Sequence, residues 1–151
     1  ERTCTDLPRG MTGLCQPCVS DAQCREGMLC SPMEFNGTPV GTYCLWRQDA
    51  EGSGAPNGDC VSARPYVRAI DVTSVDGTDA TVCGLATTTC EALNDFRSTS
   101  CESDDDCGVE GLEDGYCAMA DSSAQRCTYR CLSDDDCKVG SDCNSEDRCS
   151  L

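Results

Sequence analysis

The sequence predicts a small disulfide-rich fold, mostly loops with short strands and short helical turns, arranged as serial cystine-framed modules. Three observations predict it. Seventeen of the 151 residues are cysteine and none is histidine. Large aromatic residues are scarce, with two Phe, one Trp and four Tyr, so burial of apolar surface alone has little to work with. The same cysteine spacing also recurs three times along the chain.

The density of cysteine predicts an oxidising compartment. Disulfides persist outside the reducing cytosol, and each contributes about 2–4 kcal/mol by restricting the unfolded chain. We therefore expect a mature secreted, extracellular or cell-surface chain whose leader has been removed. The sequence contains no run approaching the ~20 apolar residues that a membrane span needs.

The net charge of −16 bears on the class of partner. Residues 101–151 carry 14 acidic against 4 basic side chains. Nucleic acid and anionic membrane surfaces would repel such a chain. The partners that we expect are other copies of the chain, in a homo-oligomer or filament, or another extracellular protein.

Three segments of the form C-x-S-D-x-[QD]-C define repeated units. They predict a first unit at residues 1–48, a second at 98–129 and a third at 130–151, with a linker and central segment at 49–97. Each unit contains four framework cysteines, which are Cys18, Cys24, Cys30 and Cys44, then Cys101, Cys107, Cys117 and Cys127, then Cys131, Cys137, Cys143 and Cys149. Spacing alone does not fix the pairing; we predict that the first cysteine of a unit bonds the third, and the second the fourth.

Five cysteines remain, and because the total is odd, one of them has no partner within the chain or bonds another molecule. They are Cys4, Cys15, Cys60, Cys83 and Cys90. Cys4 is the strongest candidate for the odd sulfur. The Cys15-Gln-Pro-Cys18 motif lacks the βαβ context of a redox pair, so we expect its two cysteines to join different bridges.

The central segment holds the clearest secondary-structure signals. Residues 49–59 are rich in Gly, Pro and Ser and predict a linker. Residues 66–73 favour a strand, Asp76-Gly77 a hairpin turn, and 80–83 the returning strand. Residues 89–97 favour a helix capped by Thr88 or Thr89. Elsewhere the sequence indicates loops and single helical turns.

Two aspartate clusters have two interpretations. Calcium prefers clustered oxygen ligands, and the candidates are Asp104, Asp105 and Asp106, then Asp134, Asp135 and Asp136. Glu110, Glu113 and Asp114 could extend the first cluster, and Asp142 and Glu146 the second. Alternatively, each unit has a serine followed three residues later by Gln or Asp, as in a capping box. Capping is favoured because the first unit keeps this pattern without a triple aspartate, and no metal site is assigned.

Nothing in the sequence favours catalysis. Without histidine, Ser-His and Cys-His nucleophile arrangements are excluded, as is haem attachment through Cys-x-x-Cys-His. Paired carboxylates could hydrolyse glycosides, but that reaction needs a rigid cleft. We predict no enzyme and no cofactor, with calcium as the one possible ligand. Asn36-Gly37-Thr38 is a glycosylation sequon, although Pro39 disfavours its use.

The cysteine rhythm of residues 15–44 resembles the N-terminal cysteine-rich domain of the Dickkopf family of secreted Wnt antagonists. The C-x-S-D-x-x-C units are also similar to those of cysteine-rich surface proteins of myxobacteria. The resemblance implies small disulfide knots used for extracellular protein contacts, and no binding residue is carried over by it.

The functional expectation is a non-catalytic extracellular structural protein that self-assembles into a surface layer or filament. The odd sulfur favours assembly, and the 66–73 strand could offer an edge for strand addition. The alternatives are a secreted protein-binding module, acting as ligand, antagonist or protease inhibitor, and a calcium-dependent adhesion module.

Overall fold

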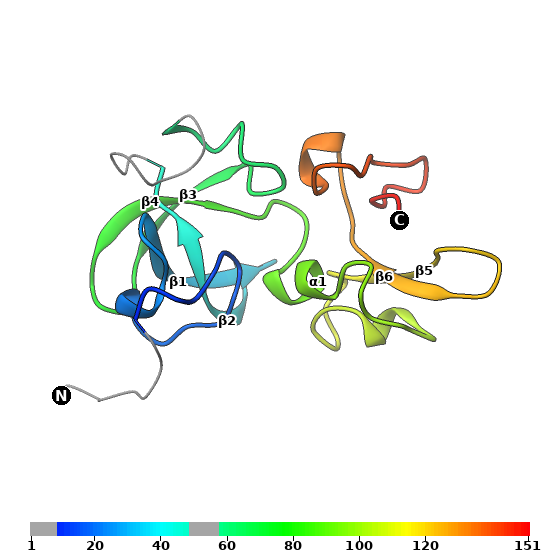
Figure 1. Ribbon diagram of the computed structural model, residues 1–151, viewed down its shortest axis with the longest axis horizontal. Coiled ribbons are helices and arrows are strands. Elements are labelled where there is room, and N and C mark those ends of the chain that lie inside the picture. Colours follow the sequence, from blue (N-terminus) through cyan, green and yellow to red (C-terminus); the bar gives the residue numbers. More distant parts are fainter. Residues whose placement is uncertain (1–8, 49–57) are drawn as a thin grey trace.

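The computed structural model describes residues 9–48 and 58–151 (Figure 1). Its elements are short. In chain order they are η1 (Asp21–Gln23), β1 (Met28–Phe35), β2 (Thr38–Trp46), β3 (Arg68–Thr73), β4 (Asp79–Gly84), α1 (Cys90–Asp95), η3 (Asp104–Asp106), β5 (Tyr116–Met119), β6 (Gln125–Thr128) and η4 (Asp134–Asp136). The strands form three antiparallel two-stranded sheets, and most of the rest is loop. The predicted disulfide-rich class is confirmed.

Eight disulfides join all sixteen cysteines of the described residues. Within every unit the first cysteine bonds the third and the second bonds the fourth, as predicted. These bonds are Cys18–Cys30, Cys24–Cys44, Cys101–Cys117, Cys107–Cys127, Cys131–Cys143 and Cys137–Cys149. All three units thus have the same pair of disulfides, first to third and second to fourth.

Two further bonds involve the central segment. Cys15 bonds Cys90 across 75 residues, and Cys60 bonds Cys83 across 23. Four of the five candidates for the odd cysteine are therefore paired. The fifth, Cys4, lies outside the described residues, as does most of the predicted linker. Cys15 and Cys18 join different bridges, as expected for a structural C-x-x-C.

The largest sheet is a hairpin that the sequence did not predict. Strands β1 and β2 pair from Met28 opposite Trp46 to Phe35 opposite Thr38. The turn is Asn36-Gly37, with φ of 50° and 82°, the left-handed geometry that an Asn-Gly hairpin turn adopts. Proline within a strand removes a hydrogen-bond donor, and a proline in a sequence segment therefore argues against a strand. Because Pro32 lies in β1 and Pro39 in β2, neither strand was predicted.

The central hairpin and helix were predicted with approximately correct bounds. Strand β3 pairs with β4 in register from Arg68 opposite Gly84 to Thr73 opposite Asp79. Helix α1 is shorter than the expected 89–97, because it ends at Asp95. Its cap is Thr89, whose hydroxyl accepts from the Ala92 N–H at 3.2 Å. The local sequence signals in this segment were therefore sufficient to predict its hairpin and its helix.

One main cluster of buried side chains links the first unit, the central segment and the third unit. It includes Val82 and Leu93 of the central segment and Tyr129, the last residue of the second unit, all fully buried, together with buried half-cystines of the first unit, the central segment and the third unit. Phe96 packs edge-on against Tyr129, with ring centroids 5.1 Å apart. The four framework cysteines of unit 1 form a separate small cluster, and those of unit 2 form another. Disulfide sulfur thus forms much of the interior.

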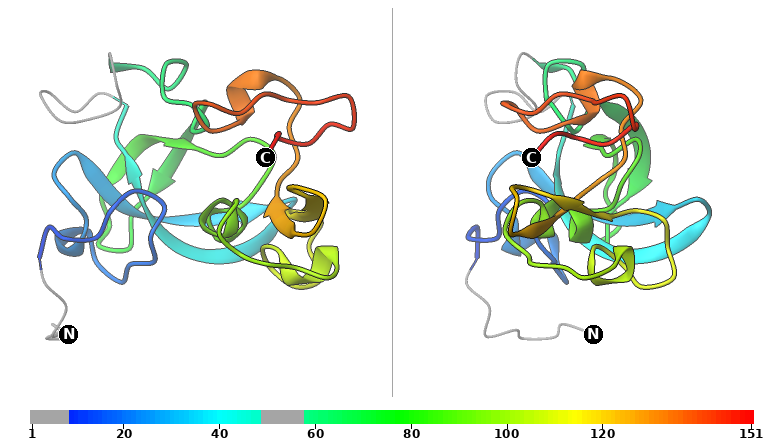
Figure 2. Two further views of the ribbon diagram at one scale, coloured as in Figure 1. Left: turned by 45° about the vertical axis from the view of Figure 1, so that its right-hand side comes forward. Right: turned by 90° about the vertical axis from the view of Figure 1, so that its right-hand side faces the viewer.

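The repeated turns of the second and third units lie toward opposite edges of the molecule, although the two units touch where Arg148 stacks over the Tyr116 ring. Figure 1 shows the yellow-green turn of unit 2, η3, at the lower edge and the orange turn of unit 3, η4, at the upper edge. Both views in Figure 2 keep this separation, with α1 between the two units. The repeated motif is therefore presented in two opposite directions.

Candidate interaction surfaces

The side chain of the third residue in each repeated turn accepts two hydrogen bonds from backbone N–H groups. In each copy a side-chain oxygen of the third turn residue accepts first from the N–H of the residue before the serine and second, at a longer distance, from the N–H of the serine cap. The acceptors are Gln23 (2.7 and 3.2 Å), Asp106 (2.8 and 3.1 Å) and Asp136 (2.8 and 3.3 Å). The capping box expected from the sequence is thus present in all three units.

The first aspartate of each turn has a structural role that sequence reasoning missed. Its carboxylate accepts from the backbone N–H of the third cysteine in the same unit. The three bonds are Asp21 to Cys30 (2.9 Å), Asp104 to Cys117 (2.8 Å) and Asp134 to Cys143 (2.7 Å). The signal was available, since this aspartate is the one acidic residue present in all three copies. It ties the turn to the strand or loop that carries the next half-cystine.

Only the middle position of the turn has no such role. It is Ala22 in the first unit, and Asp105 and Asp135 in the other two, all exposed. Two carboxylates of each aspartate triplet therefore bind backbone N–H groups, and the third faces solvent. Accepting two backbone N–H bonds lowers the pKa of Asp106. The lowered pKa suits a structural acceptor and is unsuitable for a general acid.

Asp114 does not join the acidic cluster that the sequence suggested for it. Its side chain is fully buried and accepts from the Thr89 hydroxyl at 2.5 Å and from the Val109 N–H at 3.0 Å. Asp114 therefore anchors residues 108–116, the insert that lengthens the second unit, to the N-cap of α1. This contact was not predictable, because Asp114 and Thr89 lie 25 residues apart.

The side chains close enough together to hold a metal ion are cysteines, and the aspartate triplets are not among them. Within residues 9–48 and 58–151, the groups whose ligand atoms lie within 4.8 Å of one another are three cysteine triads, one in each unit. They are Cys18, Cys24 and Cys44, then Cys101, Cys107 and Cys127, then Cys131, Cys137 and Cys149. All of these sulfurs are in disulfides, so none is a thiolate ligand in this oxidised state. The aspartate triplets do not converge in this way.

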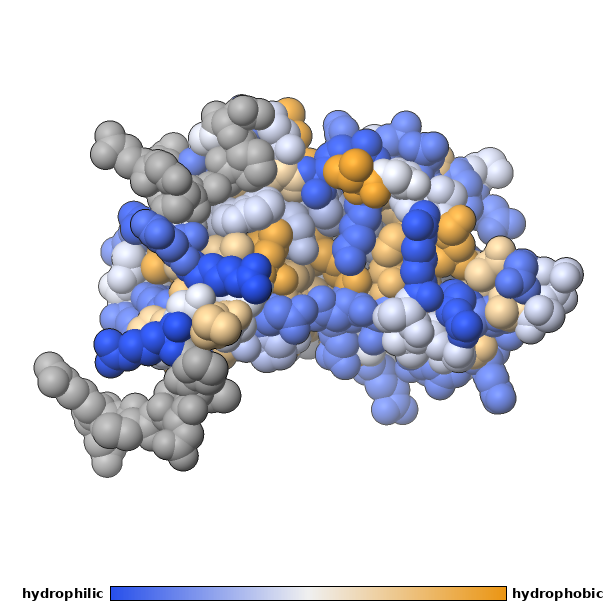
Figure 3. All heavy atoms as spheres, viewed as in Figure 1, coloured by the Kyte–Doolittle hydropathy of each residue, from blue (hydrophilic) through white to orange (hydrophobic). Residues whose placement is uncertain are grey.

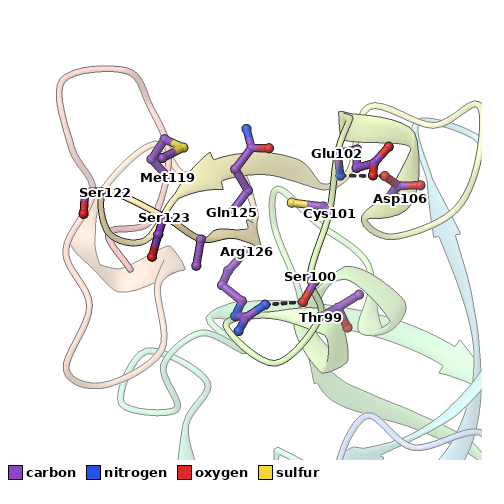
Figure 4. A pocket seen from close by; sticks show the side chains of 11 residues that line it. Thr99, Ser100, Cys101, Glu102, Asp106, Met119, Ser122, Ser123, Gln125 and Arg126 are labelled. Atoms are coloured by element: carbon purple, nitrogen blue, oxygen red, sulfur yellow. Dashed lines mark hydrogen bonds between the residues drawn. The ribbon is translucent and has the colours of Figure 1, made fainter.

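An open cleft of about 790 Å³ lies on the second unit. Figure 4 shows its polar lining, where Arg126 donates to the hydroxyl of Ser100 and the N–H of Glu102 donates to Asp106. The other lining residues are Thr99, Cys101, Met119, Ser122, Ser123, Ala124 and Gln125. Its two carboxyl groups are Glu102 and the cap Asp106. The cleft therefore offers hydroxyls and one cation for binding.

A second groove, of about 460 Å³, lies between β1 and β3. Its apolar lining includes Met33, Leu45, Ile70, Val72 and Leu85. Among the described strands, β1 pairs only with β2, and β3 only with β4. Strand β3 therefore has one edge free for an added strand, whereas the outer edge of β1 is partly used, because the Cys30 carbonyl accepts from the Val75 N–H at 3.0 Å.

Comparison with known proteins identifies no family. No protein-family model, curated protein or solved structure matches the chain. Among the described residues, no helix is long and apolar enough to cross a bilayer. The function is therefore inferred from the chain's own residues.

Proposed function

We propose that this protein is a non-catalytic extracellular structural subunit that assembles with copies of itself into a filament or surface layer. The observation that carries the proposal is the bonding of all sixteen described cysteines within the chain. Such a frame keeps its shape outside the cell without a large core, and disulfides require an oxidising compartment. The chain has seventeen cysteines, and the sixteen others are all bonded to one another. This favours a bond between Cys4 and another molecule.

The free strand edges also support assembly. Among the described strands, β3 pairs only with β4, so its other edge is one at which another copy could pair. The edge of β3 is the one that the sequence singled out, and apolar side chains border it. Edge pairing and a sulfur bond through Cys4 would be additive, because they use different parts of the chain.

Size-exclusion chromatography and electron microscopy of native material test this proposal. We expect species much larger than the 16.0 kDa chain, and a ladder on non-reducing gels that collapses to one band on reduction. Replacing Cys4 by serine should remove the ladder and leave the eight internal bonds intact. A monodisperse monomer at high concentration contradicts the proposal.

The groove between β1 and β3 favours a second candidate function, a secreted protein-binding module. An extended segment of another protein could add to the free edge of β3 and place apolar side chains on Met33 and Ile70. A single monomer band on non-reducing gels, together with capture of one extracellular partner, would place this candidate first. Calcium-dependent adhesion stays a third prediction, and it requires thermal stabilisation by Ca²⁺ that a chelator removes.

A further inference from the structure

Two cations flank one aromatic ring at the boundary of the central segment and the third unit. The guanidinium carbon of Arg97 lies 5.0 Å from the centroid of the Phe96 ring, and the ammonium nitrogen of Lys138 lies 5.9 Å from it. Lys138 is the one lysine of the chain. In a molecule with 27 acidic and 11 basic side chains, two neighbouring cations on one ring are unexpected.

The local environment leaves Lys138 without a counter-charge. Burial and the like charge of Arg97 lower its pKa, and no carboxylate of the described residues raises it. One guanidinium nitrogen of Arg97 donates to the Ser141 hydroxyl (2.6 Å) and to the Ser150 carbonyl (3.3 Å). Neighbouring Arg64 donates to the carbonyls of Cys137 and Ser141. These arginines hold the third unit in place, and the ammonium remains available to an anion.

Apolar surface lies beside the cations. Val139, the next residue after Lys138, is 82% exposed. Figure 3 shows apolar residues gathered along the middle of one face of the molecule, with hydrophilic ones around them. A positive charge bordered by exposed apolar side chains suits a protein surface bearing a carboxylate, because both kinds of group lose water on contact.

The chain itself carries an acidic surface on the turn η3 of the second unit. In η3 no residue is buried, whereas in η4 Asp136 is buried. The residue before the serine is Glu102 in unit 2, where the other units have Val19 and Leu132. Asp105 also has no structural role, since the equivalent residue of unit 1 is Ala22. The turn of unit 2 thus presents the most exposed carboxylates of the three repeated turns.

We propose that Arg97 and Lys138 bind the Asp105 carboxylate of a second copy in a head-to-tail contact. Because the two cations and Asp105 belong to different surfaces of one copy, the contact is heterologous and leaves a free surface of each kind for the next copy. This inference depends on the proposed function and names the surfaces that would carry it.

Complementary charge reversal tests it. Lys138→Glu and Asp105→Lys should each lower the association constant by about tenfold or more, since like charges then face each other. A mixture of the two variants should assemble, because every contact in an alternating chain again joins opposite charges. Asp105→Ala and Ala22→Lys change the net charge equally at equivalent exposed turn positions. We expect Asp105→Ala to weaken assembly and Ala22→Lys to leave it unchanged.

The unmodified protein provides a readout that does not depend on a variant folding. An amine-acylating reagent, with the modified residue located by mass spectrometry, should label Lys138 in dilute monomer and leave it protected in the assembled state. Assembly of wild type with Lys138 still labelled, or equal assembly of Lys138→Glu, overturns this inference and leaves the proposed function standing. A wild type that stays monomeric overturns both.

Discussion

Removing one disulfide should cost stability according to the length of loop that it closes. Cys15–Cys90 spans 75 residues, whereas Cys131–Cys143 spans 12. The chain-entropy relation gives about 4.5 kcal/mol for the long loop and about 3 kcal/mol for the short one at 25 °C. The first value is an upper bound, because the other bonds shorten the covalent path between Cys15 and Cys90.

Packing acts in the same direction as loop entropy. Cys15 and Cys90 are both buried in the main core, whereas Cys143 at the end of the short loop is only partly buried. Replacing both cysteines of a bond by serine therefore places two hydroxyls in the core at the long bond and one at the short bond. Loop entropy and packing therefore predict the same order of the two losses.

The assay is urea unfolding of the two double-serine variants. Near-UV circular dichroism follows Trp46 and Tyr129, so it reports on both halves of the core. We expect both variants to be destabilised, and the Cys15–Cys90 variant more strongly. Losses below about 1 kcal/mol, or a larger loss from the short loop, would refute the claim that loop restriction by sulfur dominates stability.

Three other perturbations test the repeated turn and the insert. Asp134→Asn weakens the charged acceptor of a backbone N–H and should cost about 1–2 kcal/mol in urea unfolding, whereas Asp135→Asn at the exposed middle position should stay within about 0.5 kcal/mol. The folded-state pKa of Asp106 is lowered, so its stabilisation is present above the ordinary carboxyl pKa and is lost as the pH falls through the folded value; pH-dependent unfolding should show a shallower acid loss in Asp106→Asn than in wild type. Gly108→Ala should destabilise by about 1–3 kcal/mol, because the added Cβ would lie 2.5 Å from the buried Asp114 carboxylate at a φ of 77°; an unchanged melting curve contradicts that account.

The disulfide frame was largely predictable because a short spacing recurs three times. Once the cysteines of each unit were aligned, one crossed pairing served all three. The bond between Cys15 and Cys90 was not predictable, since nothing local relates residues 75 positions apart. The hairpin of β3 and β4 was found from β-branched residues and Asp76-Gly77. The hairpin of β1 and β2 was missed because two prolines interrupt it, although Asn36-Gly37 marked its turn.

The acidic residues show where sequence reasoning stops. The capping acceptors Gln23, Asp106 and Asp136 followed from the serine spacing. The bonds from Asp21, Asp104 and Asp134 to the third cysteine required the path of the chain after the turn. The burial of Asp114 required its contact with α1. A run of three aspartates thus contains two structural acceptors and one free carboxylate, a division that composition does not reveal.

Counting thiols and then reducing the protein tests the central claim most directly. In denaturant without reductant, the account predicts at most one titratable thiol per chain, and after reduction it predicts loss of the near-UV signal of Trp46 and Tyr129. Many free thiols, or an unchanged signal in the fully reduced chain, would contradict it.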